Sequence, residues 1–231
     1  MGDEYSYRTD ESSFLEVLKG PSELGIAAVA YLQQQSSIPK PLSILDIGCG
    51  NGRDAFYFAE KLRCTVLGID IAEEAIQSAL HAARTAPKDN LDFQCRHFMD
   101  LTGVKYDIVH TASVYFFLRK RERAALRETI RRILNPNGLL FLSTLSVSDT
   151  EYYGKGTPVH GDCNSFLYED SPGERVYLHF STRDELVEEF WFLEIKELCE
   201  HYEYDPQVKG PVNYIPWILI GENSVPLPEN R

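Results

Sequence analysis

The feature that most constrains this chain is a glycine-rich turn between an apolar run and a helical pattern. The turn reads Asp46-Ile47-Gly48-Cys49-Gly50-Asn51-Gly52; an apolar run precedes it over 42–47 and a helical pattern follows it over 54–62. Glycine allows a sharp backbone turn and lets a ligand approach without meeting a Cβ atom. The helix start offers free N–H groups and a partial positive charge. The stretch therefore predicts a binding loop for a nucleotide-like ligand.

The alternation of strand and helix patterns continues beyond this turn. It predicts an α/β fold with a doubly wound, Rossmann-like sheet that is mostly parallel and has helices on both faces. A long antiparallel hairpin is expected at the end of the chain. Ser22 and the capping box at 181–185 each predict the start of a helix. We predict strands at 43–47, 64–69, 91–96, 106–111, 139–145, 192–204 and 213–221, and helices at 54–62, 72–84 and 119–134.

Composition excludes several classes of protein. The 231 residues are 43% hydrophobic, which is enough for a folded core. The net charge of −12 argues against a general affinity for nucleic acid or anionic membranes. No apolar run reaches the ~20 residues that span a bilayer. The five cysteines are scattered and form neither a disulfide framework nor a CxxC metal pair, so we expect a cytoplasmic protein without a metal site.

We expect a single domain over residues 1–231. Residues 1–40 have helical patterns and are expected to form an N-terminal lid. Residues 146–180 contain glycines, prolines and aromatic residues and break the regular alternation. A long loop inside a compact domain is usually functional or disordered. The aromatic residues favour an ordered loop insertion on the acceptor side of the site.

The spacing of the glycines distinguishes between possible ligands. A dinucleotide fingerprint reads GxGxxG, whereas Gly48, Gly50 and Gly52 form GxGxG. The turn also lacks the Lys-Ser/Thr pair of a phosphate-binding loop. Asp46 precedes the turn, where an acid suits a ligand that carries an ammonium group. Asp70 follows Gly48 by 22 residues, at the end of the second predicted strand, where a carboxylate can accept hydrogen bonds from two ribose hydroxyls.

Five short motifs occur in order between residues 42 and 145. They are the glycine turn at 46–52, Gly-Ile-Asp-Ile at 68–71, Phe-Met-Asp-Leu at 98–101, Tyr-Asp-Ile-Val at 106–109 and Leu-Asn-Pro-Asn-Gly-Leu-Leu at 134–140. Together they resemble the motifs of the class I S-adenosylmethionine-dependent methyltransferases. The resemblance implies a seven-stranded sheet, S-adenosylmethionine as the cofactor and S-adenosylhomocysteine as its product.

The resemblance also implies a role for each matched position. The glycines would let the backbone pass close to the methionyl moiety and the ribose, and Asp46 would contact the amino group of the cofactor. Asp70 would hold the ribose hydroxyls, Asp100 would accept from the adenine amino group, and the backbone of Thr111 would meet the cofactor. The implied cofactor residues are Asp46, Gly48, Cys49, Gly50, Gly52, Asp70, Ile71, Met99, Asp100 and Thr111.

A small molecule is the expected methyl acceptor. Methyl transfer from a sulfonium mainly requires in-line alignment of the nucleophile and exclusion of water, and aromatic walls can hold a planar substrate. His160 is the candidate general base because it lies beside Gly161 in the aromatic-rich region. His110, at the end of the fourth strand, faces either the core or the cofactor. The expected substrate contacts are Tyr115, Phe116, Tyr152, Tyr153 and Tyr214.

Other functions remain open at this stage. A basic run over 119–132 allows an RNA-facing helix, so an RNA or protein methyltransferase is one alternative, although a solvated amphipathic helix is favoured. That helix would turn Ala124, Leu126, Ile130 and Leu134 inward. A non-catalytic cofactor-binding protein is the other alternative. The segments 152–156 and 210–221 are loosely similar to those of the thiopurine and tellurite-resistance methyltransferases, a branch that acts on small thiols, oxyanions and heterocycles; this similarity does not identify the acceptor. Monomer and dimer are both open.

Overall fold

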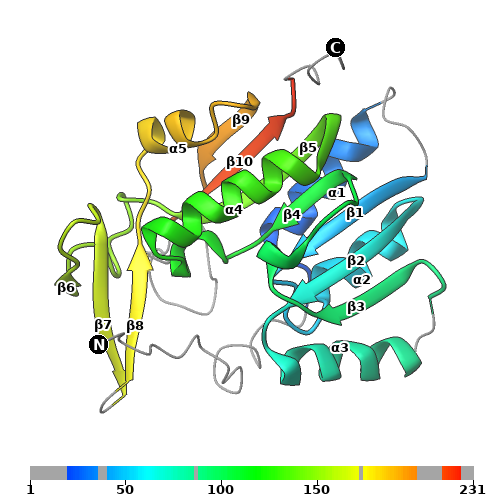
Figure 1. The fold of residues 1–231 in the computed structure, drawn as a ribbon, viewed down its shortest axis with the longest axis horizontal. Coiled ribbons are helices and arrows are strands. Elements are labelled where there is room, and N and C mark those ends of the chain that lie inside the picture. Colours follow the sequence, from blue (N-terminus) through cyan, green and yellow to red (C-terminus); the bar gives the residue numbers. More distant parts are fainter. Residues whose placement is uncertain (1–19, 36–40, 86–87, 172–173, 202–214, 225–231) are drawn as a thin grey trace.

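A mixed β-sheet forms the centre of the structure. The computed structural model describes residues 20–35, 41–85, 88–171, 174–201 and 215–224. Within them this sheet has seven strands in the order β3-β2-β1-β4-β5-β10-β9 (Figure 1). β1 to β5 run parallel to one another, and β10 is antiparallel to β5 and β9, so the predicted fold class is confirmed. The strands are β1 (Leu42–Ile47), β2 (Cys64–Asp70), β3 (Leu91–Cys95), β4 (Tyr106–Thr111), β5 (Leu134–Leu145), β9 (Glu194–Glu200) and β10 (Pro216–Glu222).

Helices cover both faces of this sheet, as Figure 1 shows. One apolar core joins α1, α2 and α3 to the sheet, and a second joins α4 and α5 to its other face. The predicted segments 1–19 and 36–40 of the N-terminal lid lie outside the described residues. The helices are α1 (Glu23–Gln34), α2 (Arg53–Lys61), α3 (Glu73–Thr85), α4 (Lys120–Ile133) and α5 (Arg183–Glu189), with 3₁₀ turns η1 (Phe98–Asp100) and η2 (Tyr115–Phe117).

Both predicted helix starts are present. The hydroxyl of Ser22 accepts from the N–H of Gly25 at 2.9 Å, which caps α1. The hydroxyl of Thr182 accepts from the N–H of Glu185 at 3.1 Å, which caps α5. Such caps satisfy N–H groups that have no partner within the helix.

α4 is amphipathic, as predicted, but two of its residues lie on the opposite side from the one expected. Leu126 and Ile130 are fully buried, whereas Ala124 is exposed. Arg123 is inside instead, with 2% of its surface exposed. A buried guanidinium is tolerated when its charge is paired and hydrogen-bonded, and a second sheet supplies those partners.

This second sheet occupies the region where the sequence predicted a long loop. β6 (Thr157–Pro158), β7 (Ser165–Ser171) and β8 (Glu174–His179) form an antiparallel sheet in that order. The prediction was therefore wrong for these segments. β6 has only two residues, and the glycines and prolines scattered over the sequence from 154 to 173 predict turns, so the sequence pattern favoured a loop.

The second sheet packs against the segment that follows β4. Phe116 of η2 lies in one apolar cluster with Leu145, Leu178 and Phe180. Figure 1 shows this sheet on the side toward which β2 and β3 point. It therefore lies toward the carboxyl ends of the parallel strands, where open α/β sheets bind their ligands.

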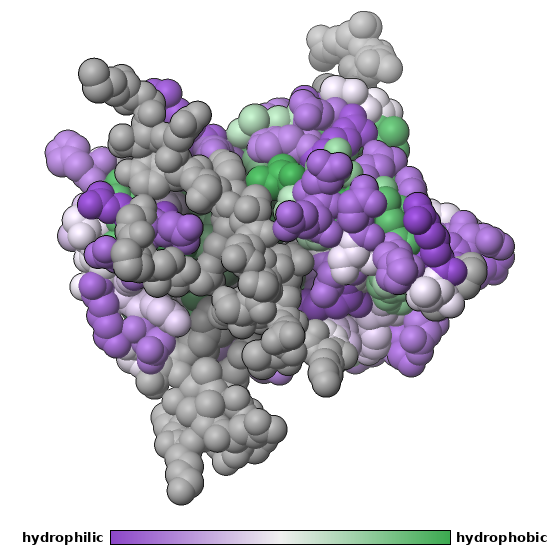
Figure 2. All heavy atoms as spheres, turned by 90° about the horizontal axis from the view of Figure 1, so that it is seen from below, coloured by the Kyte–Doolittle hydropathy of each residue, from purple (hydrophilic) through white to green (hydrophobic). Residues whose placement is uncertain are grey.

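The terminal strands and the surface complete the fold. β9 and β10 pair antiparallel, which confirms the predicted hairpin arrangement for the described residues. In the part of the chain that the structure describes, no helix combines the length and apolar character that crossing a membrane requires. The coloured surface in Figure 2 is mainly hydrophilic, with small separate hydrophobic areas, as expected for isolated exposed apolar side chains.

Candidate functional site

Three strand ends bring the predicted cofactor residues together. β1, β2 and β4 are adjacent parallel strands, so their carboxyl ends meet at one edge of the sheet. The glycine turn follows β1, Asp70 ends β2 and Thr111 ends β4. The register pairs Asp46 directly with His110 across β1 and β4. The strand order reverses between these two strands, which is where doubly wound folds bind ligands.

The backbone of the turn requires its glycines. Gly48, Gly50 and Gly52 have φ angles of +72°, +53° and +87°, a region that costs an L-residue about 1–2 kcal/mol. A Cβ atom on Gly48 would lie 2.1 Å from Cγ2 of Val114. The carbonyl of Ile69 accepts from the N–H of Gly48 at 2.8 Å. Local backbone geometry and the neighbouring strand therefore hold the turn in shape.

Asp70 links the glycine turn to the start of α3. Its Oδ2 accepts from the N–H of Gly50 at 2.9 Å, and its Oδ1 accepts from the N–H of Ala72 at 2.9 Å. Each carboxylate oxygen keeps a second lone pair. Asp70 can therefore hold the glycine turn and the start of α3 and, in the same orientation, accept hydrogen bonds from a ribose.

His110 lies between two carboxylates. Its Nδ1 is 2.7 Å from Oδ1 of Asp46, and its Nε2 is 3.9 Å from Oδ2 of Asp54, which is an ion-pair distance rather than a hydrogen bond. All three side chains are buried, and the ring of Phe58 packs edge-on against the imidazole at 4.9 Å. Burial lowers the pKa of His110, but Asp46 and Asp54 together raise it by more than burial lowers it, so the pKa lies above its ordinary value.

One oxygen of Asp46 has no partner within the described part of the chain. Its Oδ2 is buried and makes no hydrogen bond there, a condition that costs about 1–3 kcal/mol. Burial raises the pKa of this carboxyl group, and His110 offsets only part of that effect. A ligand ammonium beside the glycine turn would pair with the oxygen and balance its charge. The site therefore fits the amino group that the resemblance implies.

Two exposed apolar side chains flank the other end of the site. Ile71, directly after β2, is 43% exposed, and Met99 in η1 is 51% exposed. Leu101 is buried, so of these neighbours Met99 is the one available to cover a planar ring. Asp100 is exposed at the end of η1, and Arg96 donates to its backbone carbonyl.

Cys49 and Thr111 have their side chains inside the protein. Cys49 is buried, and its thiol lies 3.6 Å from the carbonyl of Gly50. Thr111 is also buried. These two residues therefore present backbone rather than side-chain groups to the edge of the sheet, and a backbone carbonyl is the contact implied for Thr111.

Two of the expected acceptor contacts are core residues instead. Tyr115 is fully buried; its hydroxyl donates to Glu189 and accepts from Arg127 at 2.6 Å. Phe116 is 5% exposed and packs under the second sheet. Neither ring can wall a substrate pocket in this arrangement, so the structure argues against both assignments. The sequence did not reveal this, because the single turn of η2 directs both side chains inward.

The other expected acceptor residues are more open or lie elsewhere. Tyr152 is 42% exposed, and its ring lies edge-on to Tyr168 at 6.1 Å. Tyr153 is half-buried, and His160 is exposed in the turn between β6 and β7. Tyr214 lies outside the described residues. Contacts of these residues with an acceptor stay predictions.

A buried polar network that the sequence did not reveal holds the second sheet on α4. Arg123 donates to Asp162 at 2.8 Å and to the hydroxyl of Tyr177 at 2.8 Å. The hydroxyls of Tyr177 and Ser165 are 2.9 Å apart. The sequence carried no signal for this network, since its members are scattered over three elements and only the fold brings them together.

Ser165 also belongs to a set of residue types known from hydrolytic enzymes. Its hydroxyl is 2.9 Å from Nδ1 of His179, and Nε2 of His179 is 3.1 Å from Glu185. Ser165 is 2% exposed and His179 is 0% exposed. No substrate can reach a hydroxyl buried in this way, so we assign these three residues to the support of the second sheet.

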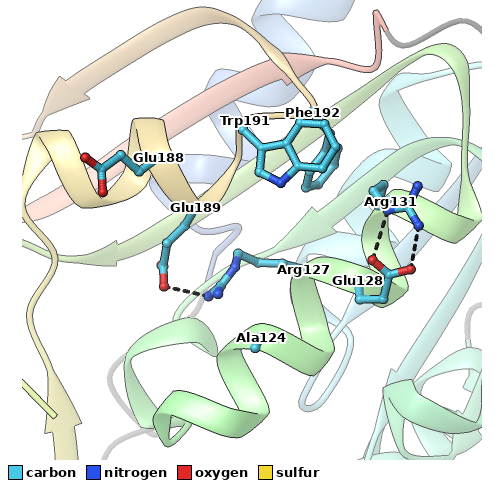
Figure 3. Close-up of a pocket in the computed structure, with 8 residues that line it drawn as sticks. All are labelled: Ala124, Arg127, Glu128, Arg131, Glu188, Glu189, Trp191 and Phe192. Atoms are coloured by element: carbon cyan, nitrogen blue, oxygen red, sulfur yellow. Dashed lines mark hydrogen bonds and ion pairs between the residues drawn. The ribbon is translucent and has the colours of Figure 1, made fainter. Parts of the chain in front are cut away.

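A surface pocket lies apart from the strand ends, between α4 and the end of α5. Its volume is about 350 Å³. Figure 3 shows that Arg127 pairs with Glu189 and Arg131 pairs with Glu128 at its wall. Trp191, which also lines it, is 70% exposed. Its arginines are already paired, and its lining includes no residue of the glycine turn, so it is not the cofactor site.

A family model described as a methyltransferase domain matches residues 38–189, which is more than half of the chain. The chain belongs to the class I S-adenosylmethionine-dependent methyltransferases. This methyltransferase is 30% identical over 114 residues to the ubiquinone biosynthesis O-methyltransferase of Neisseria meningitidis, covering 47% of this chain and 46% of that protein. The chain spans about half the length of the curated relatives it matches.

Solved structures share the fold of this methyltransferase. An S-adenosylmethionine-dependent methyltransferase from Methanosarcina mazei has a TM-score of 0.68 and 24% identity, covering 80% of this chain and 94% of that one. The 1,6-didemethyltoxoflavin-N1-methyltransferase of Burkholderia thailandensis, solved with bound 1,6-didemethyltoxoflavin and S-adenosylhomocysteine, has a TM-score of 0.63 and 17% identity, covering 87% of this chain and 77% of that one.

Proposed function

We propose that this methyltransferase transfers the methyl group of S-adenosylmethionine to a small-molecule acceptor by in-line displacement. The observation that carries the donor site is the unpaired buried oxygen of Asp46 beside the glycine turn. Asp70 adds free lone pairs at the next strand end. Asp46 would contact the ammonium group of the donor, Asp70 its ribose hydroxyls, and the exposed Met99 its planar base.

Methyl transfer from S-adenosylmethionine requires little acid–base catalysis by the protein. When bound, S-adenosylmethionine supplies a methyl carbon activated by a positive sulfur. Asp46 would hold the amino group of the donor, and Asp70 would hold its ribose hydroxyls. The glycine turn would allow the backbone to approach the donor closely. Ile71 and Met99 would shield the base from water. Such alignment and exclusion of water are the main routes to faster methyl transfer.

The second sheet is the proposed acceptor side of the site. It lies toward the carboxyl ends of the strands. The exposed ring of Tyr152 and the half-buried ring of Tyr153 precede β6 and pack against rings of β7. His160 would act as a base only for acceptors that must lose a proton, and Tyr214 remains a proposed contact. The name of the Neisseria relative, a ubiquinone biosynthesis O-methyltransferase, and the 1,6-didemethyltoxoflavin bound by the Burkholderia enzyme support this class of substrate.

Replacing Asp70 tests the donor site. Asp70→Asn keeps the size of the side chain but removes the charge that receives the ribose hydroxyls. Hydrogen bonds to a charged group contribute about 1.5–3 kcal/mol, so titration calorimetry should show S-adenosylhomocysteine binding about 10- to 100-fold more weakly. Transfer of labelled methyl groups to a panel of small thiols, amines and phenols then identifies the acceptor class.

Asp92→Asn on the exposed side of β3 is the matched control, and it should bind S-adenosylhomocysteine like the wild type. Failure of the wild type to bind S-adenosylhomocysteine would exclude the proposed function. Binding without methyl transfer to any small acceptor, together with labelling of RNA or protein in an extract, would reassign the acceptor.

A further inference from the structure

The pair formed by Asp46 and His110 connects to the N-terminal helix. Asp54, in the first turn of α2, accepts from the backbone N–H of Ser22 at 2.6 Å and from its hydroxyl at 2.7 Å. Ser22 is the cap of α1. A Cβ atom on Gly25 would lie 2.5 Å from Oδ1 of Asp54, so the contact between α1 and α2 depends on a glycine at this position.

A row of contacts therefore joins the start of α1 to the donor site. It runs from Ser22 through Asp54 and His110 to Asp46, whose Oδ2 has no hydrogen-bond partner among the described residues. His110 is fully buried, and both carboxylates are less than a tenth exposed. Removing one side chain from such a buried set leaves the charge of its partner uncompensated. The set therefore acts as a unit rather than as separate pairs.

The charges around His110 favour an ammonium ligand. Asp46 of β1 and Asp54 of α2 face the imidazole, Arg53 of α2 opposes them, and Asp70 acts on Asp46. Two carboxyl groups face one imidazole in this buried set, so its environment favours a further cation. The ammonium group of the donor would supply that cation, and Oδ2 of Asp46, which makes no hydrogen bond to any residue that the structure describes, is the atom it would approach.

We propose that His110 is a positioning residue for the methyl donor. Its Nδ1 holds the carboxylate of Asp46 so that Oδ2 faces the donor's amino group, and its Nε2 side couples the site through Asp54 to the start of α1. The inference rests on the proposed function. Donor binding and docking of α1 then stabilise each other, because a coupling free energy between two sites is reciprocal.

Two substitutions separate the two sides of the imidazole. The amide nitrogen of asparagine branches where Nδ1 of histidine lies, whereas that of glutamine reaches the position of Nε2. His110→Asn therefore keeps the hydrogen bond to Asp46, and His110→Gln keeps the side that faces Asp54. Two ligands separate the two ends of the donor site: S-adenosylhomocysteine carries the amino group, and 5′-methylthioadenosine lacks it.

Calorimetry with these ligands tests the positioning role. His110→Gln should bind S-adenosylhomocysteine about 10- to 100-fold more weakly than the wild type, the value of a hydrogen bond to a charged group. It should bind 5′-methylthioadenosine within about twofold of the wild type, since the ribose and base contacts remain. His110→Asn should restore most of the affinity for S-adenosylhomocysteine.

Hydrogen exchange tests the link to α1. S-adenosylhomocysteine should slow exchange of the amides of α1 in the wild type, and Ser22→Ala should remove this ligand-dependent protection. Thr182→Ala is the matched control, because it removes the cap of α5 and leaves the row of contacts at His110 intact. His110→Asn should bind the ligand and yet lose the protection of α1.

The possible outcomes distinguish the two proposals. A wild type that binds neither ligand overturns the proposed function. A wild type that binds both, with His110 variants that match it for both, overturns only the role of His110. Equal loss of both ligands in His110→Gln would indicate a general structural role and would also overturn the inference, as would ligand protection of α1 that survives Ser22→Ala.

Discussion

Gly48 combines two constraints at one backbone position. Its φ is +72°, and a Cβ atom would lie 2.1 Å from Cγ2 of Val114. The left-handed backbone costs an L-residue about 1–2 kcal/mol, and overpacking adds about 1–3 kcal/mol. We expect Gly48→Ala to lower the free energy of unfolding by about 2–5 kcal/mol, the sum of these two terms. Urea denaturation measures the loss.

Gly103 provides the matched control for this change. Its φ is +75°, and no described atom lies within 4 Å of the place that a Cβ would take. Gly103→Ala should therefore lose only about 1–2 kcal/mol from backbone strain. Equal losses in the two variants would show that contact with Val114 does not constrain the turn.

Single residues also show the limit of what the sequence predicts at the site. Asp46 and Asp70 lie at strand ends that apolar periodicity locates, so their place at one edge of the sheet could be predicted. The contact of His110 with Asp46 spans 64 positions and depends on the register of two strands. Tyr115 and Phe116 were misassigned because one turn of 3₁₀ helix sets the direction of their side chains.

At the scale of elements, α4 holds the second sheet through one buried cation. Arg123 is 2% exposed and donates to Asp162 and Tyr177. Methionine would fill much of the same space but would remove the donor from Asp162, from the hydroxyl of Tyr177 and from the carbonyl of Leu118. Breaking a buried pair costs about 3–5 kcal/mol. Asp162 still accepts from the N–H of Lys120, so the loss should lie at the lower end of this range. We expect Arg123→Met to lower the free energy of unfolding by about 3 kcal/mol, as measured by urea denaturation.

Arg131→Met is the control on the same helix. Arg131 forms an exposed pair with Glu128 three residues away, and such pairs contribute about 0.5 kcal/mol or less. Its stability should therefore stay near that of the wild type. A similar loss in both variants would show that the network around Arg123 adds nothing beyond a surface ion pair.

The two sheets differ in how far the sequence predicts them. β1 to β5 alternate with helices or helical turns, so both periodicities are visible. Over the residues that the structure describes, the strands of the main sheet agree with prediction to within a few residues apart from the early start of β5, and the predicted strand residues 202–204 and 213–214 lie outside them. β6 has only two residues. The position before it requires glycine, because a Cβ atom on Gly156 would lie 2.8 Å from the carbonyl oxygen of Leu167. Such close packing is a tertiary contact, and glycine alone in a sequence predicts only a turn.

For the whole molecule, charge decides which large partners are excluded. The chain carries a net charge of −12, yet α4 contains a basic run. In the structure Arg123 pairs with Asp162, and Arg127 pairs with Glu189. Arg131 and Arg132 are engaged with Glu128 and with a backbone carbonyl. Most of the run therefore supports the fold and is not a cationic surface for a polyanion.

This distribution predicts that the protein does not bind RNA. Binding to nucleic acid requires cations that displace counterions from phosphates, whereas the arginines of α4 are largely neutralised by carboxylates of the same chain. At about 150 mM salt and about 10 μM protein, a concentration within the range of non-specific dissociation constants of about 10⁻⁴–10⁻⁶ M, we expect no electrophoretic retardation of transfer RNA. Arg121 is exposed on α4, so retardation that Arg121→Glu abolishes would instead make this helix an RNA-binding surface and favour a macromolecular acceptor.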